Sequence, residues 1–147
     1  MEQKIIWMQL LLIGILSSFQ SCDKGEVDKA YYEEFYFINN SNYELTIEAF
    51  NKTDDDYVKN IYILKKDSTF HQKLELNFGS ITGVVAYSDS AVVNFGDSIK
   101  AIFLPDTQSY FNILDKSNYT VNKKSENHHE YRFVFTNDDY DNAFSSD

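Results

Sequence analysis

Apolar and polar residues alternate along much of this chain with a period of two. Between residues 43 and 49, every second residue is apolar and the residues between them are Glu or Thr. The alternation recurs over residues 74–78, and residues 131–135 keep it at Tyr131, Phe133 and Phe135. Side chains on a strand point to opposite faces in turn, so this pattern predicts strands with one buried and one solvated face.

Further strands are predicted where aromatic and β-branched residues gather, because these side chains suit a pleated surface. Those segments are residues 34–39, 57–65, 91–95, 98–104 and 118–123. Between them lie Asn-, Asp- and Gly-rich stretches typical of turns, and Gly96-Asp97 indicates a two-residue type II′ hairpin. About seven or eight strands at this spacing predict an all-β fold, an antiparallel sandwich or barrel.

The C-terminal end of the chain has a different pattern, typical of a short helix. Thr136 can cap its first turn, and Asp139 stands where a capping box would place Glu. Residues 140–144 would then supply a short helical turn after the last strand.

The N-terminal end has the features of a secretory signal. Residues 5–16 are mostly apolar and follow Lys4, and small or polar residues precede Cys22. A membrane-spanning helix needs about 20 apolar residues, so cleavage is the better interpretation of this short run. The stretch from Phe19 to Cys22 resembles the acylation site of bacterial lipoproteins, with the small Ser21 before the cysteine.

This resemblance predicts a lipid-anchored chain divided into three parts. Residues 1–21 are expected to be cleaved, and acyl chains such as palmitate would then hold Cys22 in the outer membrane, at the cell surface or the periplasmic face. Residues 22–34 form an acidic tether, which resembles a surface-export signal but is equally well explained as a solvated linker. Residues 35–147 form a single domain, which has no disulfide because Cys22 is the only cysteine.

The net charge of the chain bears on which partners it can bind. The chain has a net charge of −10, which argues against binding to nucleic acid or to an anionic membrane surface by general electrostatics. The membrane is therefore expected as a partner through the lipid anchor alone.

Several short stretches resemble a family of small Bacteroides-type lipoproteins of unknown function. They are residues 35–41, 89–95, 112–114, 117–119, 131–136 and 139–140. The family shares the order of a strand, an Asn-rich turn, a hairpin, an Asn-Tyr loop and a final strand ending in Asp-Tyr. The resemblance implies an immunoglobulin-like β-sandwich, and it implies no catalytic residue.

Candidate metal sites are weak in this sequence. His128 and His129 are adjacent in a predicted strand and would point to opposite faces, while His71 is far away in the sequence. The acidic clusters at residues 54–56 and 138–141 lack the Gly and the Glu spacing of a calcium loop. We therefore expect no metal and no cofactor.

Catalytic motifs are also missing from the sequence. No serine lies in a Gly-x-Ser-x-Gly elbow, and there is no Gly-rich phosphate loop, so we expect no catalytic residue. A small hydrolase or metal-dependent enzyme of the periplasm or cell surface stays open as the alternative, since the separation of paired carboxylates is spatial.

Tyrosine is unusually frequent, and the sequence leaves two explanations for it. Eight tyrosines exceed the usual needs of a sandwich core: Tyr31, Tyr32, Tyr36, Tyr57, Tyr62, Tyr87, Tyr110 and Tyr119. Exposed rings could stack on sugars or anchor a protein partner, whereas packing in the core and on the sheets is the simpler explanation. The sequence predicts a non-catalytic envelope lipoprotein that acts as a binding or assembly module for a glycan or an envelope protein.

Three serines are candidates for modification. Ser68, Ser90 and Ser98 each follow an aspartate, and the three sites resemble the Asp-Ser/Thr-aliphatic acceptor of Bacteroides-type O-glycosylation.

Overall fold

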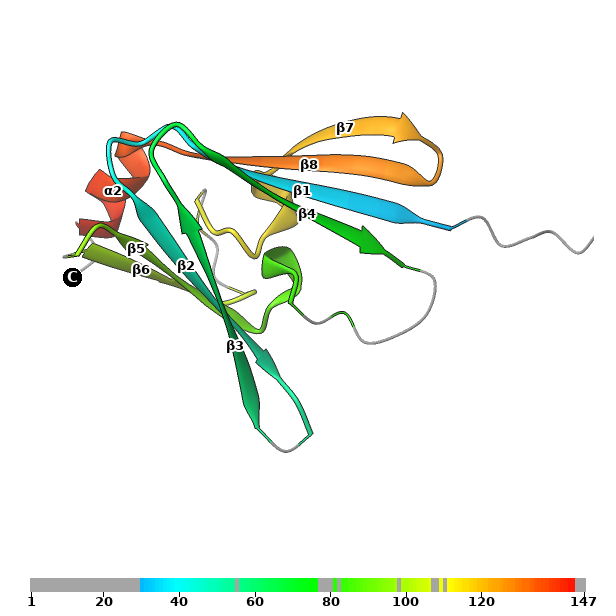
Figure 1. Cartoon of the computed structure of the whole chain (residues 1–147), viewed down its shortest axis with the longest axis horizontal. Coiled ribbons are helices and arrows are strands. Elements are labelled where there is room, and N and C mark those ends of the chain that lie inside the picture. Colours follow the sequence, from blue (N-terminus) through cyan, green and yellow to red (C-terminus); the bar gives the residue numbers. More distant parts are fainter. Residues whose placement is uncertain are drawn as a thin grey trace, which may run out of the picture.

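The computed structural model describes residues 30–54, 56–76, 81, 83–97, 99–106, 109 and 111–144. The predicted signal peptide, the predicted acylation site Cys22, the candidate Ser98 and most of the predicted tether lie outside these residues. The described part is a β-sandwich with one short helix at its C-terminal end (Figure 1).

Two four-stranded sheets form the sandwich, which confirms the predicted fold class. The β1 sheet has the order β4-β1-β8-β7, and the β2 sheet has the order β3-β2-β5-β6. All pairs are antiparallel except β1–β8, which is parallel. The strands are β1 (Tyr32–Asn39), β2 (Leu45–Lys52), β3 (Tyr57–Leu64), β4 (Thr69–Glu75), β5 (Ser90–Phe95), β6 (Ile99–Phe103), β7 (Thr120–Ser125) and β8 (His128–Phe135).

The core lies between the sheets and follows from the alternation of each strand. Phe35 and Phe37 on β1 face Leu45 and Ile47 on β2, and all four side chains are fully buried. Burial of each large apolar side chain contributes about 1.5–3 kcal/mol to the stability of the folded state. The inward positions of β5, β6 and β8 complete this core with Ala91, Val93, Phe95, Phe103, Phe133 and Phe135.

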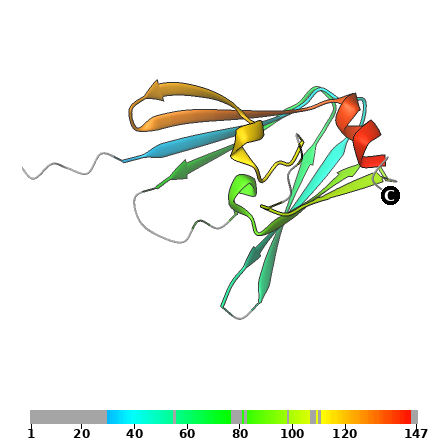
Figure 2. The same cartoon turned by 180° about the vertical axis from the view of Figure 1, so that it is seen from behind.

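The two sheets are joined at one end and splay apart toward the other (Figures 1 and 2). At the joined end, the β1–β2 and β3–β4 connections cross from one sheet to the other, next to α2 (Asn137–Phe144). Toward the splayed end, the short helices η1 (Val85–Tyr87) and η2 (Lys116–Asn118) lie in the widening space between the sheets.

A buried asparagine organises the turn between β1 and β2. The side-chain oxygen of Asn39 accepts hydrogen bonds from the amide and the hydroxyl of Ser41, at 3.0 and 2.7 Å. Its amide group donates to the carbonyls of Tyr43 and Leu64, at 2.8 and 3.0 Å. The turn predicted from the Asn-rich stretch is therefore confirmed, and Asn39 also ties it to the end of β3.

The predicted helix start is also confirmed. The backbone amide of Thr136 donates to the carboxylate of Asp139 at 2.7 Å, which is the reciprocal bond of a capping box. Burial raises the pKa of Asp139, while the hydrogen bonds from Thr136 oppose that shift. Tyr140 then docks the helix by stacking on Tyr43, with ring centroids 4.0 Å apart.

β1 begins earlier than the sequence indicates. It starts at Tyr32, so residues 32–34 belong to the sheet and not to the predicted tether. Glu33 lies two residues before Phe35 and points to the same buried face of the sheet. Because Glu33 is charged, the apolar alternation in the sequence did not reveal this first part of the strand.

The β5–β6 hairpin differs from its predicted turn. The last pair of the ladder joins Phe95 to Ile99, which a two-residue turn at Gly96-Asp97 does not allow, so the predicted turn is wrong. Gly96 does have a positive φ of 60°, which glycine adopts without the steric cost of a Cβ.

Candidate functional site

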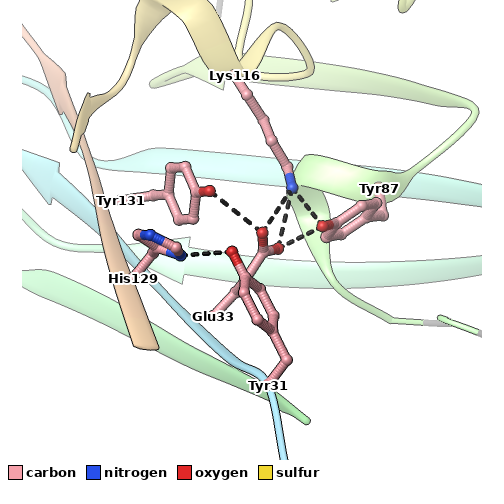
Figure 3. A network of polar contacts seen from close by, with 6 residues as sticks. All are labelled: Tyr31, Glu33, Tyr87, Lys116, His129 and Tyr131. Atoms are coloured by element: carbon pink, nitrogen blue, oxygen red, sulfur yellow. Dashed lines mark hydrogen bonds and ion pairs between the residues drawn. The ribbon is translucent and has the colours of Figure 1, made fainter. Parts of the chain in front are cut away.

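The most distinctive polar feature is a network around Glu33 between the sheets, near the splayed end (Figure 3). Glu33 is 4% exposed. Lys116 on η2 donates to both of its carboxylate oxygens, at 3.2 Å for Oε1 and 2.9 Å for Oε2. The hydroxyl of Tyr87 donates to Oε2, and that of Tyr131 donates to Oε1 at 3.2 Å. Both oxygens of this buried carboxylate are therefore engaged within the protein.

Aromatic rings surround the ammonium group of Lys116. Its Nζ lies 3.9 Å from the ring centroid of Tyr87, 5.1 Å from that of Tyr131 and 5.4 Å from that of Phe35. Such cation–π contacts are strongest where water is excluded. Lys116 also donates a hydrogen bond to the Tyr87 hydroxyl.

The two tyrosine hydroxyls of the network stay protonated at physiological pH. Burial, followed by the contacts with Glu33, raises the pKa of Tyr131 to about 12. The same causes raise the pKa of Tyr87 further. Both groups therefore act as hydrogen-bond donors, and the network works as an internal cross-link that holds η1 and η2 against the β1 sheet.

A second hydrogen bond lies beside this network. It joins the hydroxyl of Tyr31, just before β1, to Nδ1 of His129 on β8. Sequence reasoning missed the whole constellation, because it placed Glu33 in the tether and gave Lys116 no role. The signal that could have found Glu33 is the alternation itself, extended two residues upstream from Phe35.

His128 and His129 point to opposite faces of the β1 sheet, as the sequence predicts. Nε2 of His128 lies 3.2 Å from the carboxylate of Glu34 on the outer face, and Nε2 of His71 lies 3.5 Å from it. The Tyr36 hydroxyl donates to the same carboxylate at 2.7 Å. This hydrogen bond, together with the nearby histidines and Lys73, lowers the pKa of Glu34.

No metal centre emerges from these groups. Among the described residues, no three His, Cys, Asp or Glu side chains are placed to hold a metal ion together. The acidic cluster at the start of α2 borders an open hollow of about 510 Å³ with Asp138, Asp139 and Asp141. Within that cluster, the Asp139 carboxylate already accepts two hydrogen bonds from Thr136.

The outer face of the β2 sheet carries large apolar side chains among its polar ones. Five large side chains there are more than half exposed, and we call them the apolar face: Tyr57, Ile61, Ile63, Ile102 and Leu104. The register places Ile61 of β3 in one row with Glu48, Val92 and Ile102 across the sheet.

Lysines border the apolar face. Lys52, Lys59 and Lys100 occupy outward positions of β2, β3 and β6, and all three are exposed. Glu48 is the one acidic residue at the outward positions of these four strands, and it lies 3.7 Å from Lys59. This face is therefore locally basic on a chain whose net charge is −10.

Most of the surplus tyrosines serve the fold. Tyr119 is 6% exposed, and Tyr62 donates a hydrogen bond to the carbonyl of Gly83. Tyr31, Tyr32, Tyr36 and Tyr87 are half-buried and contact a histidine, a lysine or a carboxylate. Tyr57 is 60% exposed, and Tyr110 lies outside the described residues.

Two of the three candidate O-glycosylation serines lie in the described structure. Ser68 sits in the β3–β4 turn, where its hydroxyl donates to the carbonyl of Lys65 at 2.6 Å. Ser90 begins β5 at an outward position of the β2 sheet. Both side chains are half-buried, so the attachment of a glycan stays a prediction.

Comparison with protein-family models, curated proteins and solved structures gives no significant match for this chain. Within the described residues, no helix has the length and apolar character required to cross a bilayer. A function for this chain is therefore inferred from its geometry and surface chemistry.

Proposed function

We propose that this chain is a non-catalytic binding or assembly module of a bacterial cell envelope that recognises a protein partner through the apolar face. In this proposal, acyl chains on Cys22 hold the module in the outer membrane, at the cell surface or the periplasmic face. The observation that carries the proposal is the group of large aliphatic side chains on the outside of the β2 sheet.

Exposed apolar side chains on a sheet face favour a protein partner on energetic grounds. Large apolar side chains exposed together on one face often mark interaction sites. Ile63 and Ile102 are each 62% exposed, so a partner that covered them would remove substantial apolar area from water. This removal contributes about 25 cal/mol per Å² before the costs of association are subtracted.

The positive charge of the lysines around the apolar face indicates which kind of protein surface would bind there. The three lysines favour a protein surface whose apolar centre is bordered by carboxylates, because complementary charges steer encounter and fix orientation. The acidic residues Asp54 and Asp56 at the tip of the β2–β3 hairpin oppose contact between this end of the sheet and an anionic bilayer.

A glycan partner is less well supported than a protein partner. Sugar recognition by stacking uses exposed aromatic rings, whereas most of the described tyrosines are engaged in hydrogen bonds or ring contacts inside the fold. On the apolar face, Tyr57 is the single aromatic residue among four aliphatic ones.

Native-size analysis of the full lipoprotein in solubilised envelopes tests this proposal. We expect the chain to migrate in a larger assembly, and Ile102→Asp should shift it to a smaller size. Val134→Asp is the matched control, since Val134 is an exposed strand residue on the other sheet. Equal effects of the two substitutions, or a wild-type chain that migrates alone, would contradict a protein-binding role of this face.

A further inference from the structure

In the described part of the chain, four strands form the edges of the two sheets, and three of them carry features that discourage pairing. β7 has Lys123 and Lys124 and an irregular register near its end. β4 has a polar or charged residue at every second position, namely Thr69, His71, Lys73 and Glu75. β6 has only five residues and contacts α2. Short strands, edge lysines and bulges are the usual protection of an edge against a second chain.

β3 is the exception among these edges. It has eight residues and no proline, and Lys59 is its one charged residue. Its ladder with β2 runs without interruption from the pair Leu45–Leu64 to the pair Lys52–Tyr57. Val58, Ile61 and Ile63 on this strand are 46%, 52% and 62% exposed. An exposed, regular and apolar edge of this kind is a template for a further strand.

We propose that β3 pairs in antiparallel orientation with β3 of a second copy of this chain, which joins two β2 sheets into one sheet of eight strands. A two-fold axis at Asn60 places Tyr57 of one copy opposite Ile63 of the other, and Lys59 opposite Ile61. Aromatic and β-branched residues are favourable cross-strand partners, and no like charges face each other in this register.

Charges at the two ends of β3 identify a second copy as the occupant. Asp54 and Asp56 precede the strand at the hairpin tip, and Lys65 and Lys66 follow it. Antiparallel pairing brings the acidic end of each copy against the basic end of the other, whereas parallel pairing would bring like charges together. The strand is therefore complementary in charge to itself, as an isologous two-fold interface requires.

This dimer does not depend on the proposed partner. It would make the apolar faces of the two copies continuous across the two-fold axis, because both lie on the outer side of the joined sheet. A dimer that binds no partner would support the dimer and contradict the proposed function. A monomer that binds a partner would do the reverse.

Sedimentation of the detergent-solubilised full lipoprotein, supported by charge variants, tests the dimer. Ile61→Lys places a lysine opposite Lys59 of the other copy and should raise the dimer dissociation constant about tenfold or more, since like charges directly opposite are unfavourable. The double variant Ile61→Lys, Lys59→Glu restores an opposite-charge pair and should recover the dimer. Ile102→Lys makes the same change on the far edge of the same sheet and should leave the dimer intact.

Cysteine cross-linking tests the register independently. Tyr57→Cys with Ile63→Cys in one chain should give disulfide-linked dimers on mild oxidation, whereas each single variant should not, because its two cysteines lie far apart across the axis. A wild-type chain that stays monomeric at all concentrations would overturn the proposal. Dimers that Ile61→Lys leaves unchanged would overturn it too, and single variants that cross-link as well as the double variant would overturn the register.

Discussion

Glu33 shows how one residue position can set the architecture around it. Its parity with Phe35 forces the carboxylate between the sheets, where an unpaired charge would be very costly. Lys116, Tyr87 and Tyr131 satisfy both oxygens, so three elements distant in sequence are fixed against β1. We interpret this network as structural, because side chains of the fold satisfy both carboxylate oxygens of Glu33.

Removal of the lysine should therefore destabilise the domain. Lys116→Met leaves Glu33 buried without a counter-charge, and we expect a loss of about 2–3 kcal/mol in the free energy of unfolding, less than for a fully buried pair because Lys116 is partly exposed. The double variant with Glu33→Gln should recover much of this loss, since no unpaired charge remains. Denaturant unfolding measures both, and a Lys116→Met variant as stable as the wild type would contradict the assigned role of the pair.

The outer face of the β1 sheet gives a prediction about pH. The hydrogen bond from Tyr36 is the largest cause that lowers the pKa of Glu34 below its ordinary value of 4.5. The stability that this depressed pKa contributes is therefore complete above pH 4.5, and it is lost as the pH falls through the lower pKa of the folded state.

Tyr36→Phe removes that hydrogen bond and should raise the pKa of Glu34 toward its ordinary value. NMR titration of the Glu34 side-chain carboxyl measures the shift, and Tyr32→Phe serves as a control on the same face of the same strand. An unchanged Glu34 pKa in Tyr36→Phe would show that the histidines and Lys73 alone set it.

At the scale of elements, Asn39 is the residue on which the joined end of the sandwich depends. Its buried side chain makes three hydrogen bonds within the β1–β2 turn and a fourth to the carbonyl of Leu64 at the end of β3. Asn39→Ala should lower the free energy of unfolding by about 2–4 kcal/mol, because buried backbone groups lose their partners. Asn40→Ala is the control, since Asn40 is exposed. Calorimetry that finds equal stability for the two variants would contradict this role.

Most strands and the final helix could be predicted because alternation and capping are local signals, whereas the strand predicted at residues 74–78 overlaps β4 only at the end of β4. Residues 43–49 show the buried and solvated faces of β2 directly, and Thr136 with Asp139 marks the start of α2. The order of the strands could not be predicted, since alternation identifies the face of a side chain and not the neighbouring strand. The parallel pairing of β1 with β8 therefore emerges only from the structure.

The candidate surfaces were hidden from sequence reasoning for the same physical reason. Ile61 and Ile63 point to the same face of β3 as Lys59. The sequence does not say whether this face is the buried or the outer one, so the exposure of the two isoleucines becomes evident only in the structure. The Glu33 network joins residues far apart in sequence, and no local spacing reports such a contact.

At the scale of the whole molecule, charge and apolar surface are unevenly distributed. The chain has a net charge of −10, whereas the outer face of the β2 sheet combines exposed aliphatic side chains with lysines. A domain with such an asymmetric surface can present one face to a partner while the rest of its surface stays solvated.

The proposed anchor gives a prediction at this scale. Cys22→Ala should release an otherwise folded domain from the membrane fraction, because the acyl chains have no other attachment site in the proposal. Fractionation of cells, with circular dichroism of the released chain, measures the outcome. Ser21→Ala keeps a small residue before the cysteine and should leave the chain membrane-bound, whereas a Cys22→Ala chain held by an uncleaved leader would contradict the anchor.

The most direct test of the protein-binding role is photo-cross-linking in intact cells from a reactive amino acid at position 102, compared with one at position 134. The two positions are exposed strand residues on opposite outer faces of the sandwich. A binding role of the apolar face predicts a discrete protein adduct from position 102 and none from position 134. Equal adducts from both positions, or none from position 102, would contradict it.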